Sequence, residues 1–236
     1  MCIRDRHQLK QYLTSFTSLD CEYTKGRSRE PIGAPRRIAF SGEKWRSDFR
    51  LNYNVEAFDG DRVILVNGAN TQQQSLQSHA NHHCYSPMVF TGRSLSSTNK
   101  TLLEIIEESE ARISSENLNG IRGYRIIFDD VPSRTKTRNL KVSIFVDPQK
   151  EHAPRQISVR LADDVKKNFG WQQIWTVEEF SLVPDFATGD LRWFPKRATL
   201  TQSADAPTFT MHISKTRINP DLPIDVFRPT PNGRPQ

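Results

Sequence analysis

Four side chains in the first half of the chain have the chemistry of metal ligands. They are His79, His82, His83 and Cys84, in the pattern H-x-x-H-H-C. Imidazole and thiolate groups suit zinc or copper, and two histidines three or four residues apart on a helix can share one ion. No second ligand pair stands at a fixed spacing elsewhere, and the flanking Ser, Asn and Pro residues favour a loop. We therefore predict a solvated loop with no metal and no cofactor, and keep a metal protein or enzyme built on this cluster as a third hypothesis.

Paired carboxylates could do acid and base catalysis, and the chain has two such pairs, Asp163-Asp164 and Glu178-Glu179. Adjacent residues on a strand point to opposite faces, so Glu178 and Glu179 cannot act together on one substrate. No G-x-S-x-G, P-loop, H-E-x-x-H or G-x-G-x-x-G motif occurs. The sequence predicts no catalytic residue and a protein that is not an enzyme.

A run of basic residues could contact a polyanion. It consists of Arg134, Lys136, Arg138 and Lys141. Nucleic-acid recognition on a sheet needs aromatic side chains between such charges, and none is interleaved here. We predict a solvated face and no nucleic-acid partner, with peripheral contact to anionic lipid headgroups as the functional alternative.

Composition sets the size of the core that must position any site. The 236 residues are 36% hydrophobic with a mean hydropathy of -0.64, but 13 Phe and 4 Trp supply bulky core material. A net charge of +6 indicates weak attraction to anionic surfaces. No linker divides the chain, so we predict one domain over residues 7–230, a non-native or misread start at 1–6 and a tail at 231–236. Cys21 and Cys84 are either a disulfide or, as we favour, two unrelated buried thiols.

The clearest structural signal is the stretch 140–161. Apolar residues alternate with polar ones on both sides of the segment D-P-Q-K-E-H-A-P. This period of two indicates two strands, each with one buried face, and the prolines place a turn between them. We predict an antiparallel hairpin that forms a middle rib of a curved sheet.

The other elements surround this hairpin. An apolar stripe at i, i+3, i+4 and i+7 predicts an amphipathic helix over 8–17, and a capping box from Thr101 to Glu104 begins a short second helix. The pairs Asp59-Gly60 and Asn119-Gly120 are hairpin signals. Residues 68–97 are interpreted as irregular loop with a short strand near 88–90. Strands are further expected over 19–25, 38–40, 44–51, 62–67, 111–117, 121–129, 172–183, 192–201 and 208–218.

Four segments, taken in order, resemble the LolA/LolB-like family of outer-membrane lipoprotein-sorting proteins. After the apolar-striped helix come F-S-G-E-K-W-R-S-D-F, F-D-G-D-R-V-I-L-V-N, V-D-P-Q-K-E-H-A-P-R-Q-I and T-R-I-N-P-D-L-P-I-D-V-F-R-P. The resemblance implies an α+β fold, mostly antiparallel β: a LolA-like curved half-barrel with one N-terminal helix and a short inserted helix on its concave face. It also implies an exported protein of the periplasm or cell envelope, and we expect that a signal peptide has been lost from this sequence.

The functional prediction follows from the apolar side of this sheet. Two short helices cover less apolar surface than eight or more strands offer, so a ligand or a partner would fill the remainder. We predict non-catalytic binding of a hydrophobic ligand or lipidated protein, with lipid or lipoprotein acyl chains as partners. The alternative is an envelope sensor or scaffold that recognises a protein through the concave sheet. The predicted ligand-binding residues are Val142, Ile144, Val146, Ile157, Val159, Leu161, Trp175, Phe209, Met211 and Ile213.

Overall fold

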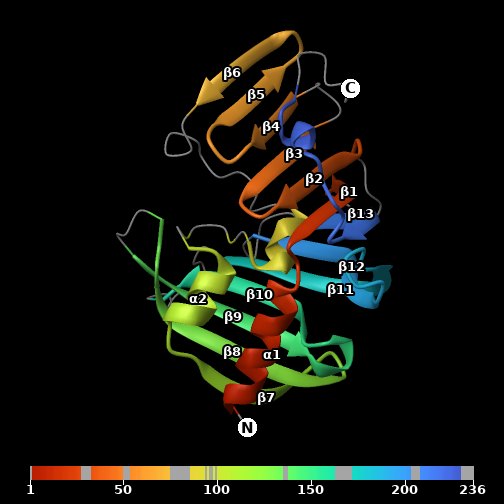
Figure 1. Ribbon diagram of the computed structural model, residues 1–236. Coiled ribbons are helices and arrows are strands. Elements are labelled where there is room, and N and C mark those ends of the chain that lie inside the picture. The colour runs from red at the N-terminus through yellow and green to blue at the C-terminus, as the bar shows by residue number, and fades with distance from the viewer. Residues whose placement is uncertain are drawn as a thin grey trace.

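One long antiparallel sheet organises the protein (Figure 1). The computed structural model describes residues 2–27, 33–49, 54–74, 86–93, 95, 98, 100–134, 138–162, 172–202 and 208–229. Within these residues the sheet has 13 strands in the order β6-β5-β4-β3-β2-β1-β13-β12-β11-β10-β9-β8-β7. The strands are β1 (Ser18–Gly26), β2 (Arg36–Ser41), β3 (Lys44–Phe49), β4 (Asn54–Phe58), β5 (Val63–Asn67), β6 (Asn70–Gln74), β7 (Arg112–Leu118), β8 (Ile121–Pro132), β9 (Asn139–Asp147), β10 (Ala153–Leu161), β11 (Gln172–Pro184), β12 (Leu191–Thr201) and β13 (Phe209–Ile218).

The two halves of the sheet are consecutive meanders that meet in the middle. Strands β1 to β6 pair in sequence order, as do β7 to β13, and the first and last strands of the chain, β1 and β13, join the two runs. Chain-adjacent strands pair because short turns suffice for antiparallel neighbours. The curved, mostly antiparallel sheet with helices confirms the predicted α+β half-barrel.

Two α-helices lie among the described residues, on the same side of the sheet, in front of β7 to β10 in Figure 1. They are α1 (Cys2–Thr14) and α2 (Leu102–Glu108). The predicted capping box is present: Thr101 accepts from the Glu104 backbone N–H, and the Glu104 carboxylate accepts from the Thr101 N–H. No helix in the described part of the chain is long and apolar enough to cross a bilayer.

The hairpin signals are confirmed by the backbone. Asn119 and Gly120 join β7 to β8 with positive φ at both residues, at 53° and 86°, as a two-residue type I′ turn requires. The hairpin of β9 and β10 is also present, with Ser143 opposite Ser158. It is not a middle rib, however: β13 is the central strand, and β9 and β10 are the third and fourth strands from the β7 edge.

Residues 68–97 contain the main error of secondary-structure prediction. Residues 70–74 form β6, the outermost strand, although every side chain is polar. The short strand expected near 88–90 is a 3₁₀ helix, η4 (Pro87–Thr91), which Ser86 caps with its side chain. Pro87 explains the difference, because proline fits the first turn of a helix and donates nothing to a ladder. The remaining short helices are η5 (Pro148–Lys150) and η7 (Ile224–Phe227).

Candidate functional site

The face of the sheet beneath the helices is continuously apolar. It brings together the ten residues predicted from the sequence: Val142, Ile144, Val146, Ile157, Val159, Trp175, Met211 and Ile213 are buried, and Leu161 and Phe209 are partly buried against them. They belong to one hydrophobic cluster that extends across the sheet from Val63 of β5 to Ile126 of β8. Side chains of the helices belong to the same cluster. The ten predicted residues are therefore part of the hydrophobic core while the helices cover them.

Helix α1 covers this face with the predicted stripe. Leu9, Tyr12 and Leu13 are buried on α1, and Phe16, two residues past the end of the helix at Thr14, is buried beside them, so the helix ends earlier than the predicted residue 17. The Tyr12 hydroxyl donates to the Trp193 carbonyl of β12 at 2.8 Å, and burial raises the pKa of this phenol far above its usual range. The Phe16 ring lies 5.8 Å from the Phe194 ring. Apolar contact plus one hydrogen bond therefore hold the C-terminal half of α1 on the sheet.

The segment that carries η4 and α2 packs beside α1 on the same side of the sheet. Leu102, Ile105 and Ile106 of α2 are buried, as is all of η4. The backbone of Gly92 approaches α1 so closely that a Cβ there would stand 3.2 Å from the Leu13 Cδ1. An ion pair, Lys10 Nζ to Glu107 Oε1 at 2.8 Å, joins the exposed surfaces of the two helices. The helices thus form one cover, which we call the lid: α1, η4 and α2.

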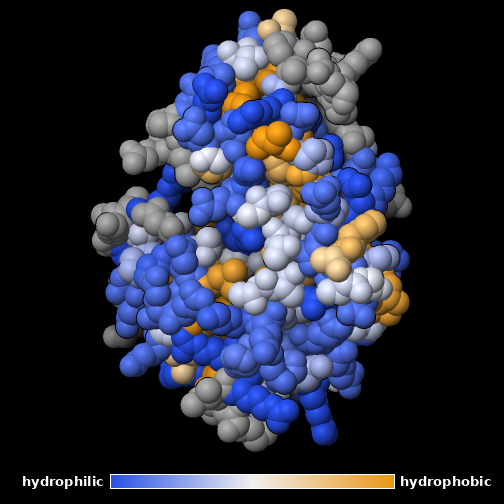
Figure 2. Space-filling view, in the orientation of Figure 1, coloured by the Kyte–Doolittle hydropathy of each residue, from blue (hydrophilic) through white to orange (hydrophobic). Residues whose placement is uncertain are grey.

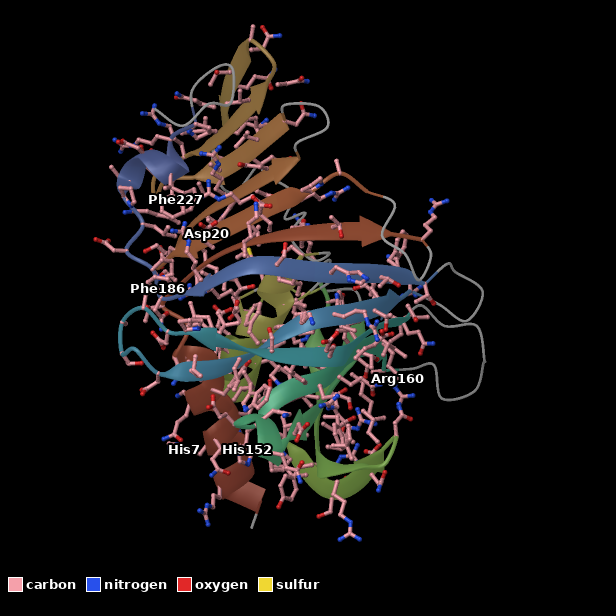
Figure 3. The ribbon with its side chains drawn as sticks, turned by 90° about the vertical axis from the view of Figure 1, so that its right-hand side faces the viewer. His7, Asp20, His152, Arg160, Phe186 and Phe227 are labelled. Carbon is pink, nitrogen blue, oxygen red and sulfur yellow. The ribbon has the colours of Figure 1, made fainter. Side chains whose placement is uncertain are left out.

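A crevice opens beside the lid, between the helices and β7. It has a volume of about 490 Å³ and is lined by apolar Ile106, Ala111 and Ile113, by basic Arg6, His7 and Lys10, and by Glu107, which pairs with Lys10. Figure 3 shows His7 on α1, on one side of the sheet. A cationic rim above an apolar floor suits the headgroup end of an amphiphile. The prediction from sequence missed this crevice, because its residues come from three elements that no sequence pattern links.

One polar atom among the ten predicted ligand-binding residues lacks a hydrogen-bond partner. The indole Nε1 of Trp175, a fully buried residue, has no hydrogen-bond acceptor in the described structure. Trp175 stands on β11 opposite Ile157 of β10 and Leu200 of β12, which offer no side-chain acceptor. Leaving such a donor unpaired costs about 1–3 kcal/mol. A carbonyl or carboxylate oxygen of a bound molecule would remove that cost.

The other candidate groups from the sequence are not assembled into a site. The Glu178 and Glu179 side chains each form an ion pair with β12, to Arg197 and Lys196, both at 2.7 Å. The hydrogen bond from Lys196 lowers the pKa of Glu179. Asp163-Asp164 and the cluster from His79 to Cys84 lie outside the described residues, and within those residues no three His, Cys, Asp or Glu side chains could hold one metal ion.

The structure also describes part of the basic run and one of the two cysteines considered as a disulfide pair. Arg134 and Arg138 are exposed, and Lys141 forms an ion pair with Asp129 at 3.2 Å. Lys136 and Cys84 lie outside the described residues. Cys21 is a free, buried thiol whose pKa is raised by burial, so it reacts poorly as a thiolate.

Apolar side chains that reach solvent concentrate on one hairpin. Leu182, Phe186 and Leu191, all of the β11–β12 hairpin, are 47%, 60% and 54% exposed. Figure 2 shows orange side chains at the right-hand edge of the molecule, at the level of these strands, on a surface that is otherwise mostly blue. Three side chains are far fewer than a stable protein interface of about 800 Å² per partner uses. The large apolar surface of this protein is therefore the covered one.

Solved structures with this arrangement of sheet and helices share little sequence with the chain. A LolA superfamily protein from Nitrosomonas europaea matches with a TM-score of 0.54 and 12% identity, over 95% of this chain and 96% of that one. An outer membrane lipoprotein-sorting protein domain from Vibrio parahaemolyticus matches with a TM-score of 0.58 and 11% identity, over 95% of each chain. The chain has a LolA-like fold. A DUF1329 family protein from Desulfovibrio piger matches equally well, with a TM-score of 0.58 and 10% identity, over 95% of this chain and 96% of that one.

Comparison by sequence adds nothing to this result, since no family model and no curated protein matches the chain. At such identities the likeness concerns the fold alone. The LolA-like fold nevertheless accounts for the arrangement described above, in which helices cover the apolar side of a curled sheet. What the covered face binds depends on its own side chains.

Proposed function

We propose that this LolA-like protein binds the acyl chains of a lipid or lipidated protein, without catalysis, between its sheet and its lid. The observation that carries the proposal is the continuous apolar face of β8 to β13, which α1, η4 and α2 cover within the part of the chain that the structure describes. Removing apolar surface of an acyl chain from water contributes roughly 25 cal/mol per Å². A face of this kind can therefore hold such a chain without any covalent bond.

Binding requires the lid to move, because its side chains now occupy the face. The lid is a layer separate from the strand ladder: α1 is held on the sheet by its apolar stripe, by the Tyr12 hydrogen bond and, just past its end, by hydrogen bonds from Arg192 and Asn219 to Ser15. The crevice beside β7 supplies the entry, with Lys10 and His7 near the headgroup and Ile106 and Ile113 along the chain. Farther in, the unpaired Trp175 N–H offers one hydrogen bond to an ester or carboxyl oxygen.

The proposed setting is the periplasm or cell envelope, where lipidated proteins and free lipids are both available. Two of the similar structures support this setting by their names, a LolA superfamily protein and an outer membrane lipoprotein-sorting protein domain. Peripheral contact with a membrane fits the same role, because a carrier must take up and release its load at a lipid surface.

A cross-link across the lid tests the proposal. Cysteines replace Lys10 and Glu107, whose side chains meet at 2.8 Å, after Cys2 and Cys84 are changed to Ser. A short bismaleimide then ties α1 to α2, while buried Cys21 stays unreacted. Binding of a fluorescent fatty acid should be at least tenfold weaker in the cross-linked variant than in the same variant left unlinked, a comparison in which both proteins lack the Lys10 charge.

A matched control applies the same chemistry to the Glu179 and Lys196 pair, which joins two strands that are already paired. This cross-link should leave fatty-acid binding unchanged. If neither the unlinked variant nor the natural chain binds fatty acid, and native mass spectrometry finds no lipid after purification from a membrane-containing host, the acyl-binding proposal is wrong. Near-stoichiometric capture of one envelope protein, lost on mutation of the sheet face, would instead support the sensor or scaffold alternative.

A further inference from the structure

A second hollow lies on the opposite side of the sheet from the lid. It spans the outer faces of β7 to β11 and has a volume of about 330 Å³. On β8, Ile126 and Phe128 are buried in the core, so Arg125 and Ile127, which alternate with them, point outward into this hollow. Figure 3 shows Arg160, another lining residue, on the far side of the sheet from His7 of α1.

The strand register explains why the sheet is hollowed here. Four side chains lie in one row across β8, β9, β10 and β11, in the order Ile127, Ser143, Ser158 and Ile174. The two central members are serines and the outer two are isoleucines, so the row is low in the middle and high at both ends. The next row contains Lys141, Arg160 and Gln172 on β9, β10 and β11. Small hydroxyls thus form the floor, and long polar side chains form a wall.

The charge of the hollow is positive. Arg125, Lys141 and Arg160 line it together with a single acid, Glu116. Glu116 is already engaged, since it accepts two hydrogen bonds from Arg125, both at 2.8 Å, and these bonds lower its pKa. Arg160 is exposed and has no hydrogen-bond or ion-pair partner within the described structure. The lining therefore contains three cations and one anion, and because Lys141 is also paired with Asp129 at 3.2 Å, Arg160 carries the unpaired positive charge beside the serine hydroxyls.

Several contacts fix the position of the Arg125 guanidinium. Besides its two bonds to Glu116, it donates to the Gln156 Oε1 at 2.9 Å, and Gln156 in turn donates to the Thr176 hydroxyl at 3.3 Å. The planar guanidinium also lies over the Phe145 ring, 5.3 Å from its centroid. A cation fixed by such contacts loses little conformational entropy when an anion arrives.

We propose that this hollow binds a phosphate-type oxyanion, carried by a soluble phosphomonoester or by the headgroup of a phospholipid. Guanidinium and ammonium groups form strong charge-assisted hydrogen bonds to phosphate, and the free hydroxyls of Ser143 and Ser158 add donors on the floor. The space suits a headgroup or a small phosphorylated molecule. A nucleic acid would need aromatic side chains for its bases, and the hollow is lined by none. Because it lies on the other side of the sheet, this site is independent of the acyl-binding face.

The test measures phosphate binding with two variants that leave the fold in place. Arg160→Gln removes the unpaired cation, and Ser158→Leu keeps every charge but fills the floor between Ser143 and Ile174. Arg122→Gln is the matched control, since Arg122 is an exposed arginine on β8 that points to the other side of the sheet. Titration calorimetry with inorganic phosphate and with glycerol 3-phosphate reports the soluble source. Sedimentation with vesicles containing phosphatidic acid in phosphatidylcholine reports the lipid source.

Saturable one-to-one binding to at least one probe is expected. It should weaken about tenfold in Arg160→Gln and in Ser158→Leu, in line with the loss of one charge-assisted hydrogen bond, and stay unchanged in Arg122→Gln. Circular dichroism and fatty-acid binding should be unchanged in all three variants, which separates this site from the lid. Equal affinity in Ser158→Leu and the natural chain would overturn the proposal, because attraction to general positive charge would then explain the binding. Absence of saturable binding to every probe would overturn it as well.

Discussion

Replacement of Leu13 by alanine separates a lid from an ordinary core helix. Leu13 is fully buried on α1, and its Cδ1 packs against the backbone of Gly92. Truncation of a buried leucine to alanine costs about 2–5 kcal/mol, and the close backbone here limits collapse around the missing atoms. We expect the free energy that holds α1 against the rest of the protein to fall by about 3 kcal/mol.

This loss has an unusual consequence if the ligand binds only when α1 is displaced. The apparent dissociation constant then equals the intrinsic one divided by the fraction of open molecules. A weakening of the closed state by about 3 kcal/mol raises that fraction roughly a hundredfold, since 1.4 kcal/mol is a factor of ten. Leu13→Ala should therefore destabilise the protein and at the same time bind fatty acid up to about a hundredfold more tightly.

The assay pairs fluorescent fatty-acid titration with urea unfolding. Leu19→Ala is the matched control, because Leu19 is equally buried in the same cluster but belongs to β1 of the sheet. It should lower the free energy of unfolding by a similar amount without tightening the affinity. If Leu13→Ala behaves like Leu19→Ala, with stability lost and affinity unchanged or weaker, then α1 is a fixed part of the core and the lid mechanism fails.

Four further substitutions test the fold around these faces. Burial acts to raise the pKa of Asp20, but arginine hydrogen bonds outweigh it and hold that pKa below its usual value. The free energy of unfolding should therefore fall as the pH drops below about 4, and urea melts of Asp20→Asn should lack this part of the decrease. Gly123→Ala would place a Cβ 2.3 Å from the Val146 carbonyl oxygen and should lower the free energy of unfolding by about 3 kcal/mol or more. Gly120→Ala, at a residue with φ of +86° and open space around the new Cβ, should lower it by about 1–2 kcal/mol. Thermal melts measure both changes. Thr101→Ala removes the cap of α2 and should cost about 1 kcal/mol in the same melts.

Most of the sheet was predictable because its signals are local. Period-two alternation identified β9, β10 and β13, and turn residues with positive φ identified the hairpin between β7 and β8. The capping box identified the start of α2 in the same way. The apolar face of the sheet followed from these elements, since alternation assigns each side chain to one side. Whether its ten predicted residues bind a ligand stays a prediction.

The errors arose where tertiary context decides the local structure. The strand β6 has only polar side chains, and it exists because the neighbouring β5 offers an unpaired edge. Residues 87–91 are apolar enough for a strand, yet a cap and a proline make them a helix that packs under α1. Neither the crevice nor the hollow could be found from sequence, because each is made by side chains that become neighbours only through strand register and helix docking.

The two faces of the sheet together suggest how a protein with so polar a composition could carry a lipid. Alternation along β8 to β11 places aliphatic side chains under the lid and serines, arginines and glutamines on the outside, within the same strands. A load buried on one face is therefore separated by a single layer of backbone from a cationic surface on the other. If both proposals hold, the outer hollow holds the protein at an anionic membrane surface and thereby raises the local concentration of the lipid that the crevice beside β7 takes up. Arg160→Gln should then slow transfer of fatty acid from phosphatidic acid vesicles to the protein, yet leave the affinity for fatty acid in solution unchanged.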